Sequence, residues 1–217
     1  TYRLPLFPLG LVLFPGAEAP LHIFEPRYRA LLTDVLAGDG RFGLIPPPAV
    51  GALAPGRVGA VARVTTVERL PDGRADIVVS GVERFTFAGW VDDPAPYGVG
   101  AVSPHEDLAE DPAALAPAAV RVRELATRAL LATFALKDVA GAPQPLAGEP
   151  AALSFQVAAM LGLDDEDRYA LLESRRAGDR LALLEARLGA GVRGIEARAE
   201  LHTRAKTNGH HHGPIPD

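Results

Sequence analysis

The fold is decided by a stretch that reads Val58-Gly-Ala-Val-Ala-Arg-Val-Thr-Thr-Val-Glu-Arg69. It is rich in β-branched residues, and alternate side chains point to opposite faces of a strand. The next four residues are Leu70-Pro-Asp-Gly73. Proline presets φ at about −65° and glycine accepts a positive φ, so these residues predict a turn. The following run, Ala75–Ser80, predicts the partner strand of a β-hairpin.

Short apolar runs separated by proline and glycine surround this hairpin and predict further strands. One helix interrupts them, because Pro26 suits a first helical turn, apolar residues then recur with a helical period, and Gly38 ends the segment. Many short strands with turn signals between them predict a strongly bent sheet or partial barrel. The predicted strands outside the hairpin are Leu4–Phe7, Val12–Phe14, Leu21–Phe24, Arg41–Ile45, Val82–Val91 (after a bend at Gly81) and Tyr97–Val102.

The second half of the chain predicts helices. From Pro112 onward the sequence is rich in Ala, Leu and Arg; a break at 141–145 and Pro150 separate a long helix from a second one. The acids at 164–167 suit a third helix start, where caps and the helix dipole favour them. The fold class is therefore α+β. We expect a β subdomain over residues 1–104, a helical subdomain over residues 112–204, and a disordered tail over residues 205–217.

The composition excludes several classes of protein. The chain has 217 residues, no cysteine and a formal net charge of −5. Disulfides, thiolate metal sites and thiol nucleophiles are therefore excluded, and the acidic balance disfavours nucleic acid as a partner. The start lacks the features of a signal peptide, and no run approaches the roughly 20 apolar residues of a membrane span. We therefore expect a cytoplasmic protein without a membrane partner.

The motifs that usually carry chemistry are missing or misplaced. Gly189–Gly194 matches G-x-G-x-x-G, but it lies in a helical stretch with no strand before it. His105-Glu106 matches the start of the zinc-hydrolase motif H-E-x-x-H, but the second histidine is replaced by Ala109. His210–His212 lies in the expected disordered tail. We therefore expect no catalytic residue, no cofactor and no metal. An unfamiliar enzyme site remains an alternative, and it would use Asp92, Glu106 or His105.

A second alternative is RNA binding. Arg57, Arg63 and Arg69 occupy odd positions along the predicted hairpin, and such residues of one strand share a face. A stripe of this kind could contact phosphates. Exposed strand arginines also serve to keep a sheet face soluble and to protect an edge.

Several ordered motifs resemble one family. The beginning Leu4-Pro-Leu-Phe-Pro-Leu9, then Val12-Leu-Phe-Pro-Gly16 and the segment Leu21-His-Ile-Phe-Glu-Pro-Arg-Tyr28, is similar to the start of the N-terminal domain of Lon proteases. The hairpin, including Ile77-Val-Val-Ser-Gly-Val-Glu-Arg-Phe85, resembles the centre of that domain, and the segment from Leu153 to Leu184 resembles its helical part more weakly. Around Leu21 the similarity is closest to members of the family that stand alone.

The resemblance implies a PUA-like β pseudo-barrel followed by a helical bundle that ends in a long helix. It also implies a non-catalytic module that recognises polypeptides, because neither an ATPase motif nor a Ser–Lys protease segment is found. The implied partners are unfolded or extended polypeptides and a Lon-type protease, in protein quality control. A bent sheet offers such peptides a groove or a free strand edge. The candidate peptide-binding side chains are Phe7, Phe14, Phe24 and Trp90, each of which could instead belong to the core.

Overall fold

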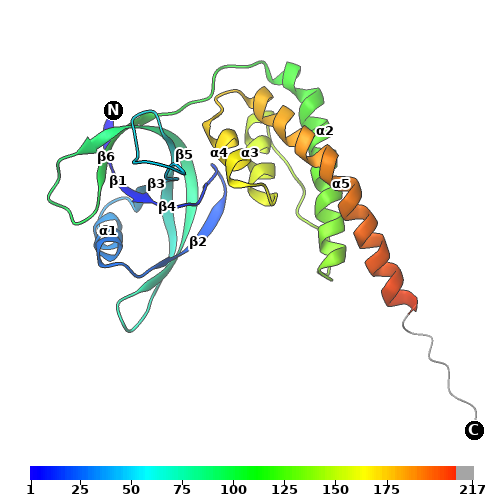
Figure 1. The fold of residues 1–217 in the computed structure, drawn as a ribbon, viewed down its shortest axis with the longest axis horizontal. Helices are drawn as coiled ribbons and strands as arrows, with labels where there is room; N and C mark the ends of the chain where they lie inside the picture. The colour runs from blue at the N-terminus through cyan, green and yellow to red at the C-terminus, as the bar shows by residue number, and fades with distance from the viewer. Residues whose placement is uncertain (209–217) are drawn as a thin grey trace, which may run out of the picture. The chain divides into compact units, whose positions relative to one another are not determined.

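The computed structural model describes residues 1–208, so the residues 209–217, which include His210–His212, lie outside the described part. The chain forms two compact units (Figure 1). The first contains residues 1–109 and 158–177, and the second contains residues 110–157 and the chain from Gly178 onward. The predicted division differs from this one, because residues 158–177 were expected in the helical subdomain but belong to the unit that contains the sheet. No described helix is long and apolar enough to cross a membrane.

Six strands form the sheet of the first unit in the order β2-β5-β4-β3-β1-β6, and β5 also pairs with β6. This last pairing closes five of the strands into a barrel and leaves β2 as an extra strand on β5 (Figure 1). Only β1 and β3 run parallel. The strands are β1 (Tyr2–Pro8), β2 (Glu18–Ile23), β3 (Arg41–Ile45), β4 (Val58–Arg69), β5 (Ala75–Val91) and β6 (Val99–Pro104).

The decisive hairpin forms as predicted, with β4 and β5 antiparallel around a turn in which Gly73 has φ +82°. The predicted strands on either side of Gly81 are one continuous strand, β5, with a register shift near that glycine. A Cβ at position 81 would lie 2.2 Å from the carbonyl oxygen of Phe14. Glycine is therefore required there because the backbone of another segment crosses the strand closely.

The prediction that Val12–Phe14 forms a strand is wrong. These residues are buried, yet they have no strand partner. The Arg168 guanidinium donates a hydrogen bond to the Val12 carbonyl at 3.0 Å, and Gly16 donates its backbone N–H to the carbonyl of Gly81. The segment is thus a buried loop, whose backbone groups are satisfied individually rather than by a ladder.

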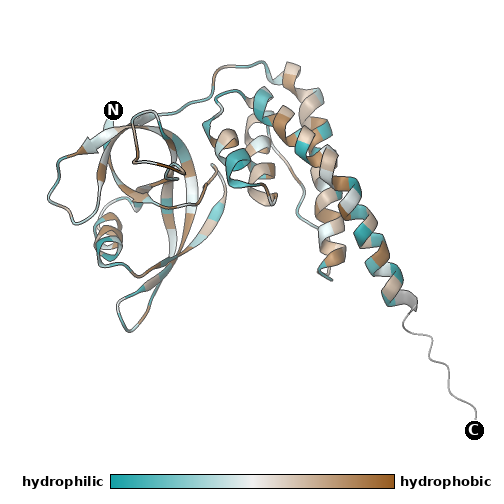
Figure 2. Cartoon of the chain, viewed as in Figure 1, coloured by the Kyte–Doolittle hydropathy of each residue, from teal (hydrophilic) through white to brown (hydrophobic). Residues whose placement is uncertain are grey.

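Two groups of buried side chains stabilise the first unit. One lies between the sheet and α1 (Pro26–Leu36), which contributes Tyr28, Leu31, Leu32 and Val35. The amphipathic character of α1 is visible in Figure 2. Its Tyr28 ring stacks on Phe7 with centroids 3.8 Å apart. The other cluster is composed of Leu4, Leu6, Ile45, Val61, Phe85, Phe87 and Val102.

The helix α4 (Asp165–Glu173) belongs to the first unit through polar contacts with the sheet. The buried Arg84 of β5 donates hydrogen bonds of 2.7 Å to the carbonyls of both Leu172 and Ser174, and it pairs with Asp107. The Tyr169 hydroxyl accepts a hydrogen bond from the backbone N–H of Val58 at 3.1 Å. Neither contact can be predicted from the alternation of apolar residues along the strands. The packing of α4 against the sheet was therefore not predicted from the sequence.

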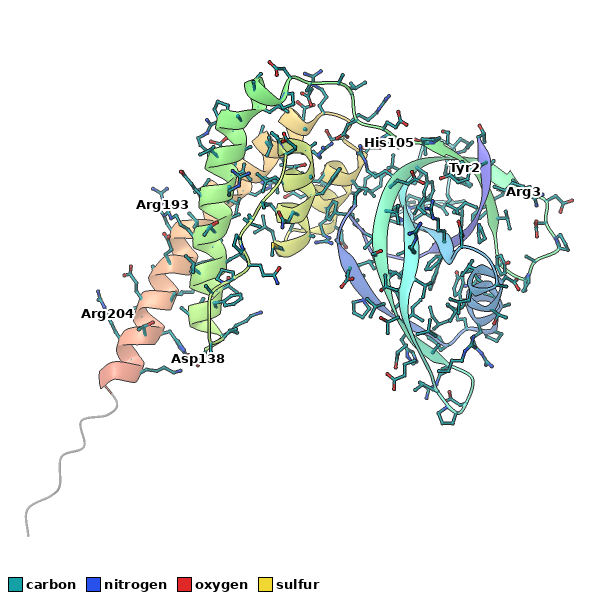
Figure 3. All side chains as sticks on the ribbon, turned by 180° about the vertical axis from the view of Figure 1, so that it is seen from behind. Tyr2, Arg3, His105, Asp138, Arg193 and Arg204 are labelled. Atoms are coloured by element: carbon teal, nitrogen blue, oxygen red, sulfur yellow. The ribbon has the colours of Figure 1, made fainter. Side chains whose placement is uncertain are left out.

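The second unit contains α2 (Pro112–Leu136), most of α3 (Pro150–Met160), and α5 from Gly178 to Asn208 of its full range Ala177–Asn208. Arg121 pairs with Glu185 and Arg128 pairs with Glu196, each through two hydrogen bonds. Asp138, which follows α2 and is labelled in Figure 3, pairs with His202 and Lys206. The residue numbers of these partners increase together along α2 and α5, so the two helices run parallel. The Gly189–Gly194 motif lies inside α5, which also continues past the predicted end at residue 204.

Candidate functional site

The structure separates the four predicted peptide-binding aromatics into two kinds. Phe7 and Phe14 belong to the core, with exposed fractions of 8% and 0%. They therefore have almost no surface to offer a peptide. Phe24 and Trp90 are 58% and 50% exposed. An exposed large aromatic side chain is available for binding in a way that a core side chain is not.

Trp90 lies on β5, where its cross-strand partner on β6 is Gly100. One edge of its indole contacts Phe87 in a T-shaped arrangement with ring centroids 5.1 Å apart. The indole also covers Gly98, at which a Cβ would lie 2.4 Å from the ring. These contacts fix the ring on the barrel and leave half of it in solvent.

Phe24 directly follows β2 and is held by its neighbour on that strand. Its ring stacks on the imidazole of His22, with centroids 5.9 Å apart and an angle of 24° between the planes. The His22 ring in turn donates a hydrogen bond from Nδ1 to Asp76 of β5 at 2.6 Å. The exposed Phe24 is therefore oriented by a chain of contacts that ends on the neighbouring strand.

A shallow groove lies on the same outward face of the sheet. Glu18, Pro20 and His22 alternate with buried residues along β2, so they point away from the core. The cavity is about 350 Å³. We call it the β2 groove, and its lining residues are Pro20, Leu21, His22, Thr66, Glu68, Asp76, Ile77 and Val78.

The lining of the β2 groove combines apolar and acidic groups. Pro20 and the partly buried Val78 face each other in the strand register, and Thr66 completes that row. His22, Asp76 and Glu68 form the next row. The groove thus offers two carboxylates beside an apolar floor, with the Phe24 ring close to it through His22.

The strand that borders the groove is an edge strand. Within the described residues, β2 pairs with β5 on one side and with no strand on the other. Proline within an edge strand removes a backbone donor, and Pro20 has this effect on β2. The pairing of β2 with β5 did not follow from the sequence pattern, and neither did the His22–Asp76 contact. The alternation of polar or small and apolar residues over Glu18–Ile23 is the sequence feature that indicates which residues of β2 point outward.

A second cavity of about 510 Å³ lies where α4 meets the start of the chain. The Arg57 guanidinium stacks on the Tyr169 ring at 3.6 Å and donates hydrogen bonds to the carbonyls of Pro46 and Pro47. Burial raises the pKa of Tyr169 above its usual range, so its hydroxyl stays protonated. Arg57 and Tyr169 therefore line this cavity as a stack of guanidinium and ring.

The arginine stripe on which the RNA-binding alternative depends is not formed. A β-bulge between Val64 and Thr66 shifts the alternation of β4. As a result Arg63 pairs with Ser80 and Arg69 with Ala75, and these partners lie on opposite faces of β5. Arg57 precedes the strand and is engaged by Tyr169.

His105, one of the residues of the alternative enzyme site, is held by structural contacts. Its Nδ1 accepts a hydrogen bond from the Thr86 hydroxyl at 2.9 Å, and its Nε2–H donates to the Glu173 carbonyl at 2.8 Å. Burial lowers the pKa of His105, which keeps the ring neutral. Both ring nitrogens are therefore occupied, and the described residues contain no group of three or more His, Cys, Asp or Glu that could hold a metal ion.

The comparison with known families agrees with this architecture. The model of the ATP-dependent protease La (LON) substrate-binding domain matches residues 3–188. The chain belongs to this family. The LON domain accounts for both the β unit and most of the helices, since the match extends into α5.

Curated relatives of this LON domain are Lon proteases. The chain is 32% identical over 184 residues to Lon protease 4 of Sorangium cellulosum, covering 82% of the chain and 22% of the relative. It is 26% identical to the Lon protease of Cytophaga hutchinsonii, covering 94% of the chain and 26% of the relative. The chain thus spans about a quarter of the length of these relatives.

Two solved structures share the fold of this LON domain. The Lon N-terminal domain protein from Xanthomonas campestris is 27% identical, with a TM-score of 0.62 over 86% of this chain and 98% of that one. The N-terminal domain of the Mycobacterium avium complex Lon protease is 18% identical, with a TM-score of 0.68 over 87% of this chain and 98% of that one. The predicted α+β fold with a β pseudo-barrel and a helical part is confirmed.

Proposed function

We propose that this LON domain recognises extended or unfolded polypeptides without acting on them chemically, through Phe24 and the β2 groove. The observation that carries the proposal is an aromatic side chain that is 58% exposed and held beside a groove on an edge strand, in a chain of the LON substrate-binding family. Trp90 offers a second exposed aromatic surface for the same purpose.

The chemistry of the groove indicates which polypeptides fit best. Pro20, Val78 and Phe24 suit apolar side chains, which are exposed in unfolded proteins and buried in folded ones. Glu68 and Asp76 suit lysine or arginine side chains in the same segment. An extended peptide with both kinds of residue therefore matches the surface.

A binding titration tests the proposal. The probe is a fluorescently labelled peptide rich in leucine, valine and lysine and free of acidic residues, followed by anisotropy. Burying the exposed part of Phe24 contributes about 1–2 kcal/mol, so Phe24→Ser should weaken binding roughly tenfold. Val50→Ser is the matched control, because Val50 is 90% exposed, lies in the loop between β3 and β4 and does not line the β2 groove.

Two results would contradict this function. The first is an absence of binding to the wild-type chain, and the second is an equal loss of affinity in the Phe24 and Val50 variants. Equal loss would show that any exposed apolar side chain contributes, rather than one surface.

We further propose that the captured polypeptide is passed to a Lon-type protease, in protein quality control. The support is the similarity to the Lon proteases of several bacteria. Degradation of an unfolded protein by a purified bacterial Lon protease, with this chain added, tests the transfer. Faster degradation at low substrate concentration is expected. Slower degradation would show competition and would contradict the adaptor role, while polypeptide binding itself would stand.

A further inference from the structure

The face of the β4–β5 hairpin opposite the β2 groove carries another pocket, of different chemistry. It has a volume of about 540 Å³ and lies between α1 and the β4–β5 hairpin. We call it the α1 pocket, and its lining residues are Pro26, Arg29, Ala30, Leu32, Thr33, Asp34, Arg69, Gly73 and Ala75. Its volume lies within the range of small ligand sites.

Two arginines from different elements converge on this pocket. Arg29 comes from α1, and Arg69 comes from the end of β4, where its cross-strand partner is the buried Ala75. The Arg29 guanidinium lies against the hairpin turn, because a Cβ at Gly73 would be 2.2 Å from its Nη2 and 2.9 Å from its Cζ. The glycine therefore serves both the turn, with φ +82°, and the close approach of the arginine.

Neither of these guanidinium groups has a hydrogen-bond or ion-pair acceptor among residues 1–208. The first unit also contains arginines that pair with a carboxylate, which is that of Asp93 for Arg3, Glu25 for Arg27, Asp72 for Arg74 and Asp107 for Arg84. Two like charges in one pocket repel each other, and an anion between them removes that repulsion.

The other polar groups of the α1 pocket are already engaged. Asp34 accepts a hydrogen bond from the Tyr97 hydroxyl at 2.7 Å, and burial with this contact raises the pKa of Tyr97 to about 12, so that the hydroxyl keeps its proton. The Thr33 hydroxyl donates to the carbonyl of Arg29. The lining therefore carries two positive charges against one negative charge.

We propose that the α1 pocket binds a carboxylate of a polypeptide, from an acidic side chain or a chain terminus. Guanidinium groups recognise carboxylates through paired hydrogen bonds. A single carboxylate suits a pocket that also contains Asp34, whereas a polyanion such as RNA would be repelled by that group and by the net charge of −5. The inference rests on the proposed function only in that the ligand is a polypeptide.

Anisotropy titrations of the whole chain test the inference. The probe is a labelled peptide of glycine, serine and glutamate, and the reference probe is the same peptide with glutamine in place of glutamate. The glutamate peptide should bind more tightly. Arg29→Gln and Arg69→Gln should each weaken its binding roughly five- to tenfold, since each loses a charge-assisted hydrogen bond. Arg29→Lys retains the charge but loses the paired geometry, so it should restore only part of the affinity.

Arg63→Gln is the matched control. Arg63 is an exposed arginine of β4, the strand that also carries Arg69, and it likewise has no acceptor among the described residues. It faces away from the α1 pocket. Its replacement changes the net charge by the same amount, so equal weakening in this variant would overturn the proposal as a general charge effect. Equal binding of the glutamate and glutamine peptides would also overturn it.

Two further measurements separate the sources of an effect. Competition by a uridine oligonucleotide that depends on Arg29 and Arg69, without binding of the glutamate peptide, would overturn the polypeptide ligand in favour of a nucleic acid. Phe24→Ser should leave the glutamate peptide unaffected. If the leucine-, valine- and lysine-rich peptide binds and the glutamate peptide does not, the inference fails alone; if neither binds, the proposed function fails as well.

Discussion

Replacing Arg84 by methionine should destabilise the first unit strongly. The side chain is 5% exposed, and it donates two hydrogen bonds of 2.7 Å to the carbonyls of Leu172 and Ser174 in addition to its pair with Asp107. Methionine has a similar length but cannot donate. The change therefore leaves two inward-facing carbonyls and a partly buried carboxylate without a partner.

The magnitude follows from these three contacts. Each buried acceptor without a donor costs roughly 1–3 kcal/mol, and breaking one partner of a buried ion pair costs about 3–5 kcal/mol. The Asp107 side chain is 28% exposed, so water compensates part of its loss. Taking the low end of each range, we expect the free energy of unfolding to fall by at least about 3 kcal/mol.

Urea denaturation followed by circular dichroism measures this change. A slope of about 1–3 kcal/mol per molar urea converts the expected loss into a midpoint lowered by at least about 1 M. Arg63→Met is the control, because Arg63 is exposed on the same sheet and should change the stability by less than about 0.5 kcal/mol. An Arg84→Met midpoint within error of that of the control would refute the view that these contacts hold α4 on the sheet.

Three other variants test different parts of the structure. Burial holds the pKa of His105 below its ordinary value of 6.5. The unfolded state therefore binds more protons than the folded state once the pH falls below 6.5, so stability should be full above that pH and decline beneath it. His105→Gln should show a smaller drop in Tm than the wild type between about pH 7.5 and 5.5. Gly59→Ala should lower stability by about 2–3 kcal/mol in urea denaturation, because its Cβ would lie 2.5 Å from Phe85 Cζ and 2.6 Å from the Leu44 carbonyl oxygen; wild-type stability would show that the barrel has room there. Asp111→Ala should cost about 1 kcal/mol, since the Asp111 carboxylate caps α2 by accepting from the N–H of Ala113, and an unchanged thermal midpoint for the helical unit would contradict this role.

Much of the fold could be predicted because it depends on local patterns. The alternation from Val58 to Arg69 and the turn that ends at Gly73 specify a hairpin by themselves, and Pro26 and Gly38 delimit a helix in the same way. The apolar run Val12–Phe14 is an exception, because its hydrophobic residues do not distinguish a strand from a buried loop. That difference depends on partners far away in the sequence, in this case the Arg168 side chain and the backbone of the distant β5 strand.

The candidate site was predicted only in part, for a similar reason. The sequence pattern does not distinguish Phe14 from Phe24. Only the packing of the folded chain shows that Phe14 is buried and Phe24 is exposed. The β-bulge after Val64 is a single inserted residue without a sequence signature, yet it places Arg63 and Arg69 on opposite faces. It thereby removes the predicted arginine stripe and places Arg69 in the α1 pocket.

The central claim is that polypeptides bind beside Phe24, and photo-crosslinking at single positions tests it most directly. Benzoylphenylalanine replaces Phe24 in one protein and Val50, which is even more exposed, in another. Each protein is irradiated with serum albumin that has been reduced and carboxamidomethylated so that it stays unfolded. We predict strong crosslinks from position 24, little from position 50, and none from position 24 to native albumin. Equal yields at the two positions, or crosslinks from position 50 alone, would contradict the account.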